Sequence, residues 1–149
     1  MVRLAGAVFG AVVALLAFPW APHAAADDGQ LFTLSGGQVQ CAVSPNNMDR
    51  GGGPMVVCQL ANGLGWANTQ FSTEKYPQPL TLAIERGTGE FHYDKGRIAA
   101  APGQGIALGP GQTYHIDGWT IEVDEHRNRF TYDESGHGLL VNPQDVRNF

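Results

Sequence analysis

Residues 38–60 read QVQCAVSPNNMDRGGGPMVVCQL, and this segment gives the clearest indication of how the chain folds. Apolar residues alternate with polar or small ones on both sides of a run rich in Pro, Asn and Gly, which is typical of two half-buried strands joined by a loop. Folding the strands back so that Cys41 faces Cys58 brings further apolar residues together on the same face: Val39 with Leu60, and Val43 with Val56. This agreement favours an antiparallel hairpin in that register.

The two cysteines of this hairpin are predicted to form a disulfide. Opposed residues of an antiparallel pair have Cα atoms roughly 4.5–5.5 Å apart, which is within disulfide reach. A bridge that closes a loop of this size is worth about 3 kcal/mol in the chain-entropy model. The alternative is a pair of buried free thiols, and export to an oxidising compartment favours the bridge between Cys41 and Cys58.

The N-terminus has the three parts of a secretory signal peptide. Arg3 gives a short basic start, residues 4–18 are apolar and uncharged, and an A-x-A cleavage site ends at Ala26. We therefore predict a signal peptide over residues 1–26, export by the general secretory route, and a single β-rich domain over residues 27–149. An uncleaved membrane anchor is the alternative, although the apolar run is short for a membrane span.

The charge balance limits the classes of partner. The chain has nine Lys and Arg against 14 Asp and Glu, for a net charge of −5, and cleavage would remove Arg3 and no acidic residue. An acidic chain without a basic cluster is a poor partner for nucleic acid or an anionic membrane surface. We expect no integral membrane span after cleavage, and an envelope component or a protein is the remaining class of partner.

The rest of the chain continues the β pattern without sustained helical periodicity. Short alternating runs separated by turns predict an all-β domain, a small antiparallel β-sandwich or barrel of about seven to nine short strands. Asn142 followed by Pro143 resembles a helix start, so we expect at most one short helical turn at the C-terminus. The predicted core includes Val39, Val56, Leu60, Trp66, Phe71, Trp119, Ile121 and Val123.

Two motifs at the ends of this domain carry a resemblance. Residues 35–41 read SGGQVQC and residues 129–141 read RFTYDESGHGLLV. The chain resembles a group of small secreted actinobacterial, mycobacterial-type proteins of unknown function, which begin with S-G-N-I-x-C and end with G-H-G-F or G-H-G-M. It departs from them at Gly37-Gln38, where Asn would follow Ser-Gly, and in having two cysteines where relatives often have more. The resemblance implies export and a compact β-domain, and it implies no reaction.

The sequence gives little support to nucleophilic catalysis. No serine lies in a G-x-S-x-G elbow, and a disulfide would remove the cysteine nucleophile. Ser135 and His137 stand two residues apart, but a working pair also needs an orienting carboxylate. We predict no catalytic residue and no cofactor. Gly136, His137 and Gly138 are predicted to form a structural turn in which the imidazole of His137 hydrogen-bonds backbone.

A repeated order of residues suggests a metal site as an alternative. Residues 91–94 read FHYD and residues 114–117 read YHID, so each segment places His and Asp two apart on one face of a strand. If the two strands were neighbours, four side chains that suit zinc or another divalent transition metal would meet: His92, Asp94, His115 and Asp117. The simpler interpretation is the solvated face of two strands.

These observations favour an exported, non-enzymatic β-domain of the cell envelope or extracellular space, of unknown specific role, acting by binding or by structure. The alternative is a small envelope hydrolase, metal-assisted through the His/Asp face. A hydrolase requires a cleft where titratable groups converge. A binding domain requires an exposed apolar or aromatic patch.

Overall fold

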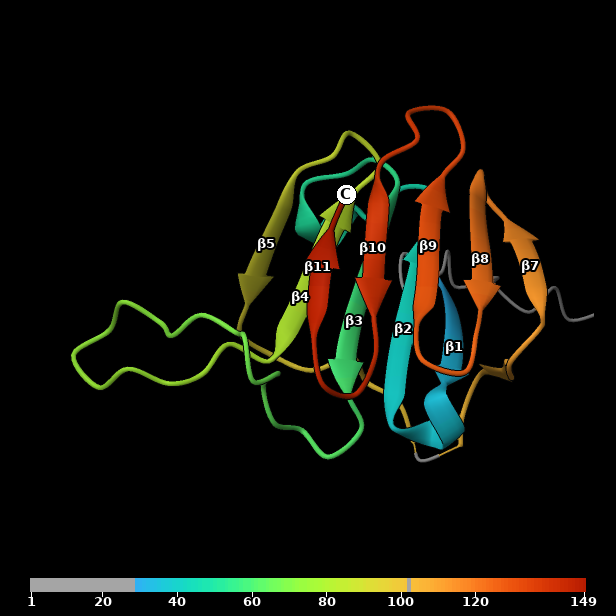
Figure 1. Cartoon of the computed structure of the whole chain (residues 1–149). Coiled ribbons are helices and arrows are strands. Elements are labelled where there is room, and N and C mark those ends of the chain that lie inside the picture. The colour runs from blue at the N-terminus through green and yellow to red at the C-terminus, as the bar shows by residue number, and fades with distance from the viewer. Residues whose placement is uncertain (1–28, 102) are drawn as a thin grey trace, which may run out of the picture.

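The computed structural model describes residues 29–101 and 103–149, which form two β-sheets packed face to face (Figure 1). The strands are β1 (Gln30–Leu34), β2 (Val39–Ser44), β3 (Met55–Leu60), β4 (Leu82–Arg86), β5 (Phe91–Asp94), β6 (Ile106–Ala107), β7 (Thr113–Ile116), β8 (Trp119–Val123), β9 (Asn128–Tyr132), β10 (Gly138–Val141) and β11 (Val146–Asn148). One sheet has the order β5-β4-β3-β2-β1-β6 and the other has the order β11-β10-β9-β8-β7. Neighbouring strands are antiparallel, apart from the parallel pair β1 and β6.

The predicted class is confirmed: the described residues form an all-β sandwich with one disulfide. They make 11 strands instead of about seven to nine, together with two 3-10 turns, η1 (Ser35–Gly37) and η2 (Met48–Arg50), and no α-helix. Strands such as β6 and β11 are too short to produce an alternation signal, which explains the lower predicted number. The predicted signal peptide over residues 1–26 lies outside the described residues.

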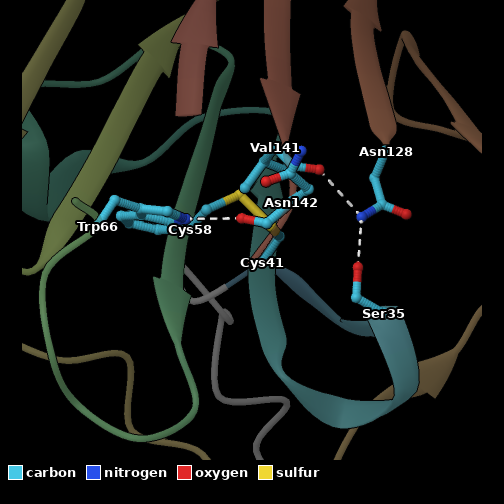
Figure 2. Close-up of a disulfide and its surroundings, with 7 residues drawn as sticks. All are labelled: Ser35, Cys41, Cys58, Trp66, Asn128, Val141 and Asn142. Carbon is cyan, nitrogen blue, oxygen red and sulfur yellow. Dashed lines mark hydrogen bonds between the residues drawn. A yellow bond between two sulfur atoms is a disulfide. The ribbon is translucent and has the colours of Figure 1, made fainter. Parts of the chain in front are cut away.

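The cysteine hairpin has the predicted register. Cys41 on β2 pairs with Cys58 on β3, and the flanking apolar pairs are Val39 with Leu60 and Val43 with Val56. The disulfide joins these strands across a Cα–Cα distance of 4.1 Å (Figure 2). Beside it, the Trp66 indole N–H donates to the Asn142 carbonyl at 2.8 Å, so the connection between β3 and β4 is tied to the second sheet.

The core lies between the two sheets. The predicted core residues on β2, β3 and β8 are all buried there, and Trp66 is buried with them. The prediction for Phe71 is wrong, because this ring is 61% exposed. Phe71 and Pro79 form an isolated antiparallel bridge at the base of a projecting hairpin, residues 69–80, which extends to the left in Figure 1. The projection carries Phe71 away from the interior.

The C-terminal residues form a strand in place of the helical turn. The side-chain oxygen of Asn142 accepts hydrogen bonds from the N–H groups of Gln144 and Asp145, each at 2.8 Å. The backbone N–H of Asn142 donates to the Asp145 carbonyl at 3.0 Å, which closes a tight turn between β10 and β11. An Asn that caps a helix also stabilises such a turn, and pairing of β11 with β10 selects the turn here.

The six-stranded sheet is covered on both faces, which the alternating pattern did not predict. Every residue of β2 and β3 is buried, including the glutamines Gln40 and Gln59. The face turned away from the second sheet carries its own apolar cluster of Met55, Val57, Leu82 and Ile84, against which Ile98 packs. We call this the outer face, and the segments that cover it build the candidate site.

Candidate functional site

A pocket of about 480 Å3 opens on the outer face of the six-stranded sheet. Its apolar floor consists of Leu31 on β1, Ala42 on β2 and Val57 on β3. We call it the outer-face pocket. Its remaining lining comes from Gly29, Asn47, Asp49, Arg50, Arg97, Ile98, Ala99 and Gln104. The lining is therefore mixed, with polar side chains beside the apolar floor, and the volume lies within the range of about 300–1,000 Å3 that is usual for pockets that bind small molecules.

One wall is the loop between the two cysteine strands, residues 45–54. Asn47 accepts the Arg50 N–H through its side-chain oxygen at 3.2 Å, and its carbonyl accepts the Gly52 N–H at 2.7 Å. The Arg86 guanidinium donates to the Gly52 carbonyl at 2.8 Å and also to the carbonyl of Arg50. These bonds fix the backbone of the loop from inside and from β4, so the loop is held in place without a ligand.

The opposite wall is the segment that follows β5, residues 96–101, which we call the covering segment. Gln59 holds it to the sheet: the Ile98 N–H donates to the Gln59 side-chain oxygen at 2.7 Å, and the Gln59 amide donates to the Ile98 carbonyl at 3.2 Å. The same amide donates to the Gln40 side-chain oxygen at 2.9 Å. Thr81 adds a bond to the Gly96 carbonyl at 2.7 Å. The two buried glutamines therefore act as the anchor of this wall.

Charge in the outer-face pocket centres on Arg50. Its Nη1 lies 2.8 Å from Oδ2 of Asp94 on β5, and the two side chains are 27% and 48% exposed. The second arginine of the lining is directed elsewhere, because a Cβ built on Gly63 would lie 2.6 Å from Nη1 of Arg97. The guanidinium of Arg97 therefore lies at the turn after β3, and Arg50 supplies the positive charge of the loop wall.

The structure separates the residues proposed for a metal site. His92 and Asp94 lie on β5, at one edge of the six-stranded sheet, whereas His115 lies on β7, at an edge of the other sheet. Asp117 follows β7 in the turn before β8, with φ of 50°. The condition for the metal site, that the two strands be neighbours, is not met, because β5 and β7 belong to different sheets; the repeated order of residues carries no information on strand pairing. Within the described residues, no three His, Cys, Asp or Glu side chains are grouped so as to hold a metal ion.

Gly136 and His137 lie in the connection between β9 and β10, and Gly138 is the first residue of β10. His137 Nδ1 lies 3.2 Å from the Phe149 carbonyl, and the Gly138 N–H donates to the same carbonyl at 3.2 Å. The Ser135 hydroxyl donates to the Gly87 carbonyl in the other sheet at 2.5 Å. The Ser135 hydroxyl and the His137 imidazole therefore both bond to backbone carbonyls. These bonds connect the C-terminus to the β9–β10 connection and connect the two sheets to each other.

One buried acid stands apart from the pocket. Glu85 on β4 is fully buried between the sheets, opposite Val56 on β3 and Phe91 on β5. Neither carboxyl oxygen has a hydrogen-bond partner among the described residues. Burial, and to a smaller extent the nearby Glu90 carboxylate, raise the pKa of Glu85 to about 7. A carboxyl without donors is held neutral over an unusually wide pH range.

The nearest approach to a catalytic array lies on the exposed face of the second sheet. His115 Nδ1 lies 3.0 Å from the Thr120 hydroxyl, which donates to Asp133 at 2.6 Å. Because the hydroxyl gives its proton to the carboxylate, the imidazole donates to the hydroxyl and does not activate it as a base would.

A polar hollow at one end of the sandwich is lined by Ser35, Gln38 and residues 125–127 and 142–144, and it lacks an apolar floor.

The described residues contain no apolar helix of membrane-spanning length. Sequence patterns singled out none of the residues of the outer-face pocket, because the Asn- and Gly-rich loop signals a turn without indicating which face the turn covers.

Compared with known proteins, the chain matches no family model, no curated protein and no solved structure.

Proposed function

We propose that this protein is an exported, non-enzymatic binding domain of the cell envelope or extracellular space, and that its ligand occupies the outer-face pocket. The observation that carries the proposal is a pocket with fixed walls on a face that a two-sheet sandwich does not need to cover. A second apolar cluster and two anchored segments line that face. Covering both faces of an antiparallel sheet is unnecessary for a stable sandwich, since one face commonly meets water.

The chemistry of the outer-face pocket favours binding over hydrolysis. Its ionisable side chains are Asp49, Arg50 and Arg97, and none of them is a nucleophile or an imidazole base. Hydrolysis requires a nucleophile or activated water beside a base in one cleft. An apolar floor beside an arginine whose backbone is held in place instead suits recognition of a small molecule.

Export is the part of the proposal that rests on sequence. The A-x-A site at Ala26 and the preceding apolar run favour cleavage there. A disulfide such as Cys41–Cys58 persists in oxidising compartments and is rare in the reducing cytosol. The resemblance of residues 35–41 and 129–141 to small secreted actinobacterial proteins supports the same location, the envelope or the medium.

Fluorescence titration with 1-anilinonaphthalene-8-sulfonate tests the proposal, because this amphipathic dye becomes bright in apolar surroundings. The folded protein should bind it saturably with one site. Ala42→Phe fills the floor and should abolish this binding, whereas Ala67→Phe, on an exposed position away from the pocket, should leave it unchanged. Unfolding curves of each variant establish that it is folded.

Ala99→Trp provides a second block at the covering segment, where the residue is exposed and lines the pocket. It should weaken dye binding without disturbing the sheet. Saturable binding that survives in both Ala42→Phe and Ala99→Trp would place the ligand elsewhere on the molecule and contradict the proposal.

A further inference from the structure

The guanidinium of Arg50 has unused hydrogen-bonding capacity at the pocket. A guanidinium offers five N–H donors in a planar fork that matches a carboxylate bidentately. Among the described residues, the only side-chain acceptor of Arg50 is Oδ2 of Asp94, reached by Nη1 alone. The pair is therefore monodentate, and Asp94 leaves most of the donors of the guanidinium unused.

Arg50 is also positioned in advance. Its N–H donates to both the carbonyl and the side-chain oxygen of Asn47, at 3.2 Å each, and its carbonyl accepts from Arg86. All three bonds hold the backbone, so they persist when the side chain changes partner. A ligand that uses the guanidinium avoids the cost of ordering this loop, which favours binding.

The charges around this position are mixed. Asp94 is paired with Arg50, Asp49 on η2 is exposed, and Lys95 forms an ion pair with Glu74 on the projecting hairpin. Arg86, the other cation beside the loop, uses its guanidinium on the loop carbonyls and lies 3.6 Å from Glu90. If the carboxylate of a ligand replaces that of Asp94, the guanidinium of Arg50 is still paired with one negative charge.

We infer that the ligand of the outer-face pocket is a small amphipathic monocarboxylate, whose carboxylate takes the place of Asp94 on Arg50 while its apolar body covers Leu31, Ala42 and Val57. The inference rests on the proposed function and specifies its ligand. The exchange costs little, because a partly exposed, monodentate ion pair contributes little to stability. The ligand gains a bidentate contact together with burial of its apolar part.

A series of ligands with one chain and different head groups tests the inference. Decanoate, decan-1-ol and decylamine share the apolar body, and each is titrated by calorimetry at pH 7.5, below the concentration at which it forms micelles. Decanoate should bind about tenfold more tightly than the alcohol, because its carboxylate is fixed by the guanidinium. Decylamine should bind most weakly, since its ammonium group meets Arg50.

Two variants separate the roles of the paired side chains. Arg50→Gln should bring decanoate down to the affinity of decanol, while leaving decanol unchanged. Asp94→Asn should strengthen decanoate binding several-fold, because it frees the whole guanidinium for the ligand. Arg129→Gln, which removes an arginine from the second sheet, serves as the matched control and should change none of the affinities.

The outcomes distinguish this inference from the proposed function. If decanol and decanoate bind with equal affinity and Ala42→Phe abolishes both, the pocket binds apolar ligands without acid selectivity, and the inference is overturned while the proposed function stands. If Asp94→Asn weakens decanoate, Asp94 supports the site instead of competing for it, and the exchange is likewise overturned. If no member of the series binds while the dye still binds at the pocket, the inference is overturned and the proposed function stands; if the dye does not bind either, both fail.

Discussion

Replacing the buried acid Glu85 by Gln should make the protein more stable at neutral and alkaline pH. The amide has nearly the same shape as the protonated carboxyl and cannot ionise. In the folded protein the carboxyl is buried without a hydrogen-bond partner among the described residues, so ionisation there is costly. The carboxyl is solvated when the chain unfolds, and its ionisation then favours the unfolded state.

The size and sign of the effect follow from the two pKa values. The pKa of Glu85 is raised from 4.5 in the unfolded chain to about 7 in the folded protein. Below pH 4.5 both states hold the proton, and the group has no effect on the free energy of unfolding. Between pH 4.5 and 7 only the unfolded state loses the proton, so stability falls by about 1.4 kcal/mol per pH unit and by roughly 3 kcal/mol in total.

Urea unfolding followed by tryptophan fluorescence at pH 4, 5.5, 7 and 8.5 measures this difference. Wild type and Glu85→Gln should have similar stability at pH 4, and the variant should be more stable by roughly 3 kcal/mol at pH 8.5. Comparing the two proteins removes the contribution of the other acids. A difference that is constant with pH would refute the reasoning, because it would mean that the Glu85 carboxyl is solvated or hydrogen-bonded in the folded state.

Four further outcomes are expected. Reducing the bridge between Cys41 and Cys58, which are 17 residues apart, should lower the free energy of unfolding by about 3 kcal/mol, measured with and without reductant; no change would contradict the bridge. Trp119→Ala should cost about 3–5 kcal/mol, whereas Trp119→Phe should cost far less, since the ring is fully buried and its indole nitrogen has no partner among the described residues. Gly138→Ala should destabilise by about 1–3 kcal/mol because its Cβ would lie 1.9 Å from the Phe130 carbonyl oxygen, and Gly109→Ala, whose Cβ would make only an ordinary contact 3.8 Å from the Gln112 side-chain oxygen, should be neutral. N-terminal sequencing of exported protein should begin at Asp27, and recovery of Met1 would contradict cleavage.

Local alternation was sufficient to predict the cysteine hairpin. Cys41 and Cys58 share a face with apolar neighbours, so a slip of one residue would expose that whole face, and the register was fixed by the pattern. The same pattern could not predict the burial of Gln40 and Gln59. Their outward direction was apparent from the sequence, but the covering segment that they anchor lies about 40 residues further along the chain from Gln59.

The candidate site was not predictable for a related reason. Ala42 and Val57 form its floor only because the loop wall and the covering segment both fold onto the outer face, and turn residues do not specify that direction. For the proposed metal site, the chemistry of the residues could be read from the sequence, but their positions in the two sheets could not. His92 and His115 carry the right chemistry in similar segments, but strand order is decided by packing of the whole chain.

The central claim is that the outer-face pocket is the ligand site, and amide chemical shifts of isotope-labelled protein titrated with decanoate test it most directly. We expect saturable shift changes clustered at Leu31, Ala42, Val57 and Ile98, with further changes in the loop wall around Arg50. Shift changes centred on the second sheet or on the projecting hairpin of residues 69–80, with none in the pocket, would contradict it.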